Sequence, residues 1–153
     1  MNLYLVRHGE ALSADVNPER PLSDTGAANV KKMAESLKRY GVSVDTVFHS
    51  TKKRAEETAR ILAETLNPVS NLVEKQGLEP NDPVDTIFRE IFEADGCLMI
   101  VGHLPFLRNL AERLLAGSKA GDLPVFKPGS VLSLAGSGTK WEITGFASPD
   151  LIG

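Results

Sequence analysis

Short runs rich in apolar residues alternate along the chain with longer segments in which apolar residues recur every three or four positions. The short runs are typical of buried strands and predict them at residues 3–6, 44–48, 72–73 and 97–101. The longer segments have the period of an amphipathic helix and predict helices over residues 24–40, 51–66, 83–92 and 105–115. Because strands alternate with helices, we expect a mainly parallel sheet covered on both faces. The predicted fold class is α/β, a three-layer α/β/α sandwich.

Residues typical of helix starts support three of these boundaries. Ser23 is a good N-cap for the first helix. Asp82 and Pro83 predict the start of the third helix, with the aspartate as N-cap and the proline at the first helical position. Pro105 also fits a first helical position, which places the start of the last helix there.

The C-terminal part of the chain has a different pattern. Residues 131–135 and 139–146 flank a Gly-Ser-Gly turn and predict an antiparallel hairpin. Before this hairpin, residues 117–129 form the loosest stretch, which we interpret as a candidate mobile loop. The sequence contains no recognisable linker or repeat, so we expect a single domain over residues 1–153.

Composition narrows the classes of protein that this chain can belong to. With 42% apolar and 24% charged residues in 153, global disorder is excluded. The single cysteine, Cys97, excludes an internal disulfide and a zinc site built from paired cysteines. Lys and Arg total 17 against 20 Asp and Glu, a net charge of −3, which argues against nucleic acid or a membrane as partner. We expect a cytoplasmic protein, since the apolar runs are too short for a bilayer.

Histidines and arginines follow the predicted strands. Arg7 and His8 follow the first strand, His103 follows the strand at 97–101, and Arg54 lies in the first turn of the helix after the second strand. In an open parallel sheet, ligands bind beyond the carboxyl ends of the strands. Arginine presents a planar fork to phosphate oxygens, and helix N-termini offer free N–H groups. The pattern therefore predicts a phosphate site.

The helix start at residues 52–54 supports the same prediction. Three cations crowd this helix N-terminus, where positive charge opposes the helix dipole. Lys52 and Lys53 each have a glutamate four residues on, Glu56 and Glu57, and we expect these to pair. Arg54 has no such partner at that spacing, and its position is better explained by an anion at the helix mouth.

Simpler structural interpretations exist for most of these residues. An isolated histidine is more often a satisfied core residue than a ligand, but His8 and His103 both follow strands, which favours a shared site. His49 also ends a strand but lacks a neighbouring Arg or Gly, so we interpret it as structural or as part of the rim of the site. Glu10 and Glu79 are most simply solvated loop carboxylates.

A metal site is the alternative chemistry for the two histidines. His8, His103 and a carboxylate would provide three zinc ligands. Arg7 and Arg54 would then place positive charge beside the cation, which disfavours metal.

Three motifs in this chain resemble the histidine phosphatase superfamily, also called phosphoglycerate mutase-like. They are Arg7-His8-Gly9, Ser50 followed by Arg54-Ala55 and Thr58-Ala59, and Val101-Gly102-His103. Further segments are similar to the small SixA-type phosphohistidine phosphatases, and they are Arg20-Pro21-Leu22-Ser23 with Gly26, Leu78-Glu79-Pro80, Gly102-His103-Leu104-Pro105, Pro128-Gly129-Ser130, Trp141 and Pro149. Larger members insert a helical cap over the site, and the length of this chain leaves no room for one.

The resemblance implies a two-step phosphatase reaction without a cofactor or metal. His8 would attack phosphorus as a neutral imidazole, and Arg7, Arg54 and a protonated His103 would hold the phosphoryl oxygens. Glu79 or Asp82 would be the general acid if the leaving group needs one. The expected substrate is phosphohistidine on a partner protein, whose P–N bond is labile.

Three alternatives to this substrate and reaction follow from the same resemblance. A small phosphorylated molecule is the alternative substrate, and a catalytically silent phosphate-binding module is the alternative function. A mutase is disfavoured, because its phosphoenzyme must be shielded from water. The sequence does not determine the oligomeric state.

Overall fold

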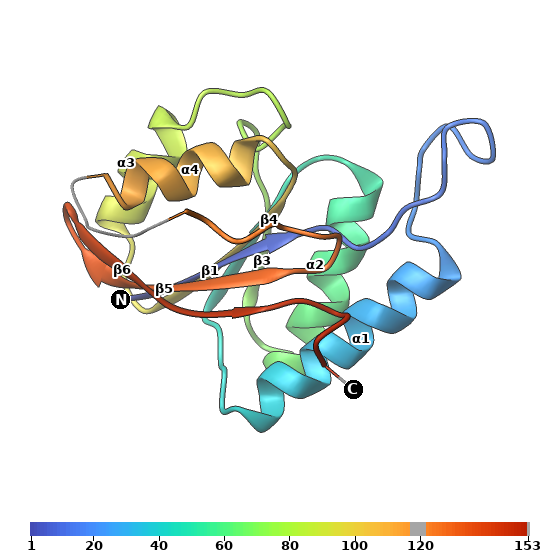
Figure 1. Ribbon diagram of the computed structural model, residues 1–153, viewed down its shortest axis with the longest axis horizontal. Helices are drawn as coiled ribbons and strands as arrows, with labels where there is room; N and C mark the ends of the chain where they lie inside the picture. The colour runs from blue at the N-terminus through green and yellow to red at the C-terminus, as the bar shows by residue number, and fades with distance from the viewer. Residues whose placement is uncertain (117–121, 153) are drawn as a thin grey trace.

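A six-stranded sheet forms the centre of the computed structural model, which describes residues 1–116 and 122–152 (Figure 1). The strands lie in the order β3-β2-β4-β1-β5-β6; β3, β2, β4 and β1 are parallel, whereas β5 and β6 are antiparallel. The elements are β1 (Asn2–Arg7), α1 (Asp24–Arg39), β2 (Thr46–His49), α2 (Lys53–Leu66), β3 (Asn71–Glu74), α3 (Asp85–Glu93), β4 (Cys97–Gly102), α4 (Phe106–Leu114), β5 (Val131–Ser137) and β6 (Lys140–Ala147). The predicted α/β class, the mainly parallel sheet and the C-terminal hairpin are confirmed.

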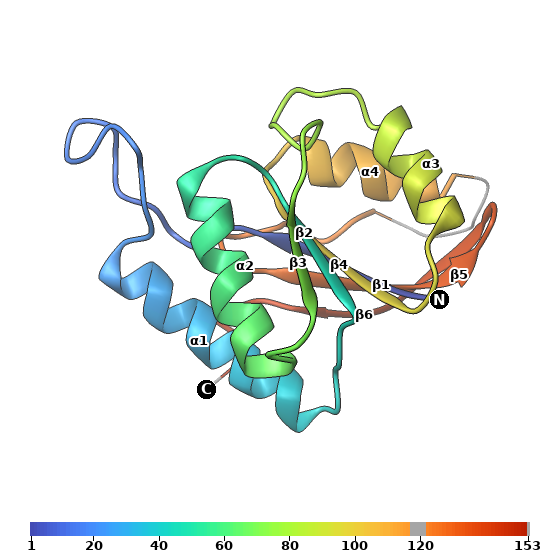
Figure 2. The same ribbon diagram turned by 180° about the vertical axis from the view of Figure 1, so that it is seen from behind.

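The helices cover the two faces of the sheet in pairs. Helices α1 and α2 lie on one face, and α3 and α4 lie on the other (Figures 1 and 2). Side chains of a strand point alternately to opposite faces, so β4 supplies both cores. Leu98 and Ile100 pack toward α3 and α4, whereas Met99 and Val101 pack toward α1 and α2. Full burial on both faces explains the almost unbroken apolar run of β4.

Strand register brings the residues that follow β1, β2 and β4 to one edge of the sheet. Arg7 of β1 is paired with Gly102 of β4, and His49 of β2 is paired with Val101. The main-chain N–H of His8 donates to the carbonyl of Gly102 at 3.0 Å, which continues the ladder one residue past β1. The edge predicted to hold the site is therefore shared by these three neighbouring strands.

The predicted N-cap of α1, Ser23, is confirmed. The main-chain N–H of Gly26 donates to Oγ of Ser23 at 3.0 Å, which satisfies one of the free donors at the helix start.

The predicted start of α3 is wrong. The helix begins at Asp85 with Val84 in the N-cap position and no side-chain capping bond, so Asp82 is not an N-cap and Pro83 is not the first helical residue. Oδ2 of Asp82 accepts the main-chain N–H of Glu79 at 2.8 Å instead. The Asp82 carboxylate therefore closes a turn with a preceding residue and does not cap the helix, which begins three residues later.

Pro105 was predicted at the first helical position but lies one residue before the start of the helix. It occupies the N-cap position of α4, which begins at Phe106, and its peptide bond to Leu104 is cis.

The segment before β5 is only partly described. Residues 117–121 of the predicted mobile loop lie outside the described residues. Phe126, from the same predicted loop, is buried in the core under α4. No helix among the described residues is both long and apolar enough to cross a membrane.

Candidate active site

His8 lies directly after β1 and is almost buried, with 8% of its surface exposed. Its Nδ1 lies 2.7 Å from the carbonyl oxygen of Gly9. A carbonyl can only accept, so Nδ1 carries the proton and Nε2 keeps its lone pair. Gly9 itself has no room for a side chain, because a Cβ there would lie 2.7 Å from Cγ2 of Val30. The fold thus presents one tautomer of His8, in which Nε2 keeps a free lone pair.

His103 directly follows β4 and lies beside His8, which follows the neighbouring strand β1. The two ring centroids lie 5.0 Å apart at an interplanar angle of 55°. The His103 ring is buried, and its Nε2 lies 2.6 Å from Oγ of Ser50. Its Nδ1 is also buried and has no hydrogen-bond partner among the described residues. The ring is therefore oriented by Ser50 and retains one unused polar atom.

The two predicted arginines bring further unused donors. Nη1 of Arg7 donates to the carbonyl of Phe126 at 2.6 Å, but its Nε is buried without a partner in the described part of the chain. The same is true of Nε of Arg54. Buried donors without partners cost free energy that an anion would recover. These donors, together with two imidazoles, suit the oxygens of a phosphate group.

Thr58 and Ser50, which belong to the sequence motifs but had no predicted role, hold this arrangement together. Oγ1 of Thr58 accepts the main-chain N–H of Gly9 at 3.0 Å and donates to the carbonyl of Arg54 at 2.7 Å. Thr58 thus links the segment after His8 to the first turn of α2. The signal in the sequence is its position one helical turn after Arg54, which places both on one face of the helix. Ser50 gives a similar signal, because it directly follows β2 at the site edge.

The expected ion pairs at the start of α2 do not form. Nζ of Lys52 lies 3.5 Å from Oε2 of Glu79, not beside Glu56. Glu57 is also engaged elsewhere, because its Oε1 accepts a main-chain N–H of the segment before α1 at 2.9 Å. Glu56 pairs with an arginine one turn further along α2. Lys52 and Glu57 therefore bond to distant segments, and Glu56 takes a different partner on its own helix.

Glu79 is not the solvated loop carboxylate that we expected. Its Oε1 accepts a hydrogen bond of 2.5 Å from Oγ1 of Thr51, and its side chain is only 27% exposed. Its Oε2 is buried and makes no hydrogen bond to a described residue, although the ammonium of Lys52 is near it. Oδ2 of Asp82 accepts the main-chain N–H of Glu79, so this oxygen is engaged. Glu10 is exposed, as expected, and its Oε1 accepts a hydrogen bond from Ser23.

His49 lies at the same edge but has a structural environment. It is 4% exposed, and its Nδ1 lies 2.9 Å from the carbonyl oxygen of Ser50. Its burial agrees with the structural interpretation.

Burial and neighbouring cations lower the pKa of both site histidines. Burial, with the added charges of Arg54 and Arg7, lowers the pKa of His8 to about 4. Burial lowers the pKa of His103 to about 3, with further contributions from His8 and Arg54. Both rings are therefore neutral near pH 7, whereas the resemblance led us to expect a protonated His103. The difference arises first from burial and then from the neighbouring positive charge, and a phosphate dianion would offset that charge.

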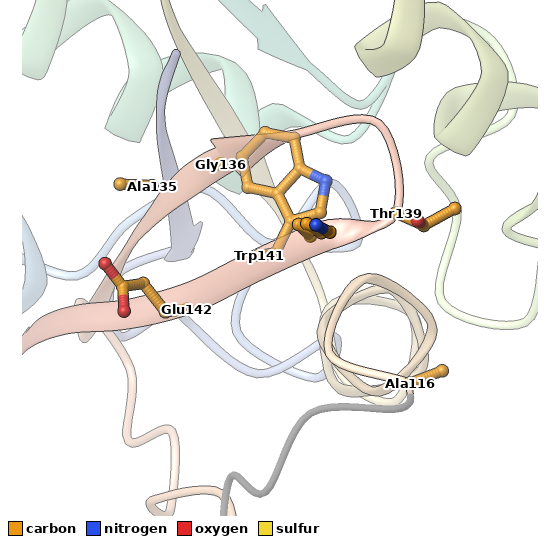
Figure 3. Close-up of a pocket in the computed structure, with 7 residues that line it drawn as sticks. Ala116, Ala135, Gly136, Thr139, Trp141 and Glu142 are labelled. Atoms are coloured by element: carbon orange, nitrogen blue, oxygen red, sulfur yellow. The ribbon is translucent and has the colours of Figure 1, made fainter.

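A separate hollow lies away from these residues. It has a volume of about 660 Å³ and lies between the end of α4 and the β5–β6 hairpin, where Trp141, Glu142 and Gly136 line it (Figure 3). Gly136 donates its main-chain N–H to the carbonyl of Met1, at the amino end of β1. This hollow is therefore at the end of the sheet opposite His8. The described residues contain no group of three or more His, Cys, Asp and Glu placed to hold a metal ion.

Comparisons with known proteins agree with this geometry. Residues 3–79 match the sequence profile of the histidine phosphatase superfamily (branch 1). The chain is 34% identical to an uncharacterised protein of Picosynechococcus sp., over 86% of this chain and 83% of the relative. It is 27% identical to the phosphohistidine phosphatase SixA of Escherichia coli K12, over 94% of each chain. It also matches a solved structure of the protein histidine phosphatase SixA complexed with tungstate, with a TM-score of 0.89, 25% identity and full coverage of both chains.

Proposed function

Because this chain belongs to the histidine phosphatase superfamily (branch 1) and is a phosphatase, we propose that it removes phosphate from phosphohistidine on a partner protein. The observation that carries this proposal is the pairing of a nucleophile with an anion site. His8 has its Nε2 lone pair free, while unpartnered nitrogens of Arg7, Arg54 and His103 lie in the same site.

In the first proposed step, Nε2 of His8 attacks the phosphorus of the substrate. A new N–P bond forms on His8 and the P–N bond to the substrate imidazole breaks. The electron pair of that bond returns to the leaving nitrogen, and because the other nitrogen of the substrate ring carries a proton, the ring leaves as neutral imidazole. Phosphoryl transfer depends mainly on positioning and on stabilising charge on the equatorial oxygens. We assign that role to Arg7, Arg54 and His103. SixA, which shares this fold, has been solved in complex with tungstate, a tetrahedral oxyanion like phosphate, and this supports an oxyanion site in this chain.

In the second step, water attacks the phosphorus on His8. A P–O bond forms, the bond to Nε2 breaks, and its electron pair restores the neutral imidazole of His8. The products are orthophosphate and a proton released to solvent. The hydrogen bond from Nδ1 to Gly9 keeps the ring in one orientation throughout.

The choice of phosphohistidine depends on the leaving group. An imidazole leaves more easily than an alkoxide and has less need of a general acid. Oε1 of Glu79 already accepts a hydrogen bond from Thr51, and the ammonium of Lys52 lies 3.5 Å from Oε2. Asp82 is already bound to the Glu79 main chain.

A small-molecule phosphomonoesterase is the second candidate function. One observation favours it, namely the buried Oε2 of Glu79, which has no hydrogen-bond partner among the described residues. A carboxyl group in that position would be the general acid for an alkoxide if it were protonated in the complex with substrate.

We also propose that residues 1–153 are one domain without a cap. Between α2 and α3 the structure contains β3 and no helix. An uncovered site suits a phosphohistidine that a bulky protein surface must present.

A comparison of substrates tests the proposal. We expect kcat/KM for a phosphohistidine peptide to exceed that for sugar phosphates by about 100-fold or more, because only the imidazole leaves readily without an acid. Glu79→Gln would be measured on both substrates, with Glu74→Gln as the control, since Glu74 is an exposed carboxylate at the end of β3. A preference for sugar phosphates that is lost in Glu79→Gln alone would contradict the proposal and establish the phosphomonoesterase.

A further inference from the structure

A second hollow adjoins the phosphate site at the start of α2. It has a volume of about 560 Å³ and lies between the segment that precedes α1 and the first turn of α2. Its charged lining residues are the cations Arg20, Lys52, Lys53 and Arg54 and the carboxylates Glu19 and Glu56. Because Arg54 belongs to both the hollow and the phosphate site, a substrate held on His8 would extend into this space.

The charges that line this hollow are not balanced within it. Lys52 is paired with Glu79, and Glu56 is paired with Arg60 further along the helix. Arg20 differs from both, because no carboxylate of the described residues lies within 4.0 Å of its guanidinium. The chain as a whole has a net charge of −3, so this concentration of cations is local.

The main chain holds Arg20 in an unusual conformation. Its φ of +48° lies in the left-handed region, which costs free energy for a residue with a side chain and persists where the surroundings enforce it. Its main-chain N–H donates to Asn17 at 2.9 Å, and its Nε donates to the carbonyl of Leu12 at 3.1 Å. The bond from Nε positions the guanidinium and leaves its two terminal nitrogens to bind an anion.

Arg20 also acts electrostatically on the phosphate site. Its positive charge contributes to the lowered pKa of His8, Arg54 and His103, after larger contributions from burial. The guanidinium is thus within electrostatic reach of three of the four residues assigned to phosphate.

We propose that Arg20, together with Lys53, forms a second anion subsite that binds a carboxylate of the substrate protein beside its phosphohistidine. This inference rests on the proposed function. A carboxylate fits an arginine fork with two parallel hydrogen bonds. The subsite also contains Glu19 and Glu56, which repel a dianionic second phosphate more strongly than a monoanionic carboxylate. Arg20 is therefore a specificity-determining residue that selects acidic sequence around the phosphohistidine.

Two phosphohistidine peptides test the source of the anion. They are identical except that acidic residues flank the phosphohistidine in one and alanines in the other. We expect the unaltered enzyme to favour the acidic peptide by roughly tenfold in kcat/KM, about the effect of one charge-assisted contact. Arg20→Gln reduces this ratio to near one. The control is Arg108→Gln, which removes the same charge from α4, where Arg108 pairs with Glu112 at 3.3 Å; it keeps the ratio.

Inhibition by small phosphonates tests the subsite independently of the substrate. Methylphosphonate carries one anionic group, whereas ω-phosphonocarboxylates of increasing chain length carry a second. We expect one chain length to inhibit roughly tenfold better than methylphosphonate, and Arg20→Gln to remove that advantage. Equal inhibition by all members, or an advantage that survives Arg20→Gln, would overturn the subsite.

The two measurements separate the possible failures. If neither peptide is hydrolysed while phosphate esters are, the proposed function is wrong. Recognition of a carboxylate on a substrate protein is then wrong as well. Inhibition by the phosphonates still decides whether the second anion subsite exists. If both peptides are hydrolysed equally well, the carboxylate is not recognised and this inference is overturned while the proposed function stands. A bisphosphate that inhibits better than every phosphonocarboxylate would identify a second phosphate as the bound group and contradict the carboxylate.

Discussion

His8 and His49 show that burial and one ring hydrogen bond do not make a nucleophile. Both are buried at the same edge of the sheet, and in both Nδ1 lies within hydrogen-bonding distance of the next residue's carbonyl. Only His8 has His103 beside its ring and the charges of Arg7 and Arg54 near it. The proposed chemistry therefore depends on the neighbours that tertiary structure brings to one of two similar residues.

This difference predicts the outcome of two matched substitutions. We expect His8→Ala to lower the hydrolysis of a phosphohistidine peptide by at least roughly 1000-fold and to abolish the acid-labile phosphoenzyme seen by mass spectrometry. We expect His49→Gln to destabilise the fold but to retain turnover within about threefold, since among the described residues the His49 ring bonds to the main chain of Ser50 and not to His8, Arg7, Arg54 or His103. Circular dichroism checks that both variants fold. Turnover by folded His8→Ala close to that of the unaltered enzyme would exclude the covalent mechanism.

At the scale of elements, a predicted helix start was correct where the capping side chain bonds to the helix that follows it, and wrong where that side chain bonds to another segment. Ser23 caps α1 through a bond to Gly26, three residues ahead, and such a bond is readable from spacing. Asp82 had the same signature, but its carboxylate bonds backward to the main chain of Glu79, and α3 begins later. The pairs expected at the start of α2 were replaced in the same way by tertiary partners.

The cap at Ser23 also connects α1 to the segment after His8. The main-chain N–H of Ser23 donates to the carbonyl of Glu10 at 3.0 Å, and its Oγ bonds to the Glu10 side chain. We expect Ser23→Ala to lower the free energy of unfolding by about 1 kcal/mol, the usual cost of a lost cap. Urea denaturation measures this, with Ser43→Ala as the control, because Ser43 is exposed in the turn between α1 and β2. Equal stability of the two variants would show that the cap contributes nothing.

At the scale of the whole molecule, the fold concentrates positive charge in a chain of net charge −3. The parallel strands bring His8 and His103 to one edge, and the first turn of α2 adds Arg54. The larger hollow near Trp141 lies at the other end of the sheet. Strand direction, rather than the size of a cavity, therefore places the proposed site.

This concentration of charge predicts how stability depends on pH. The pKa values of His8 and His103 are about 4 and about 3 in the folded protein, against about 6.5 in an unfolded chain. Between these values the unfolded chain binds more protons, so the free energy of unfolding falls as the pH drops from about 6.5 toward 4. Carboxylates also titrate in part of this range, so we would compare Tm for the unaltered protein and His8→Asn. The variant should lose less stability over this range, and an equal loss in both would contradict the burial of a neutral His8.

The sequence by itself determined the succession of strands and helices along the chain, the residue types that follow the strands and the family resemblance. These depend on local periodicity and on residues that are close together in the chain. Only the tertiary structure decided the tautomer of His8, the bond between Ser50 and His103, the neighbours of Glu79 and the position of Arg20 beside Arg54. The His8 ring bonds to the carbonyl of the next residue, but its conformation and burial are set by the fold, and the other contacts join segments that are distant in the chain. Spacing along one chain cannot specify such contacts, because they depend on which segments packing brings together.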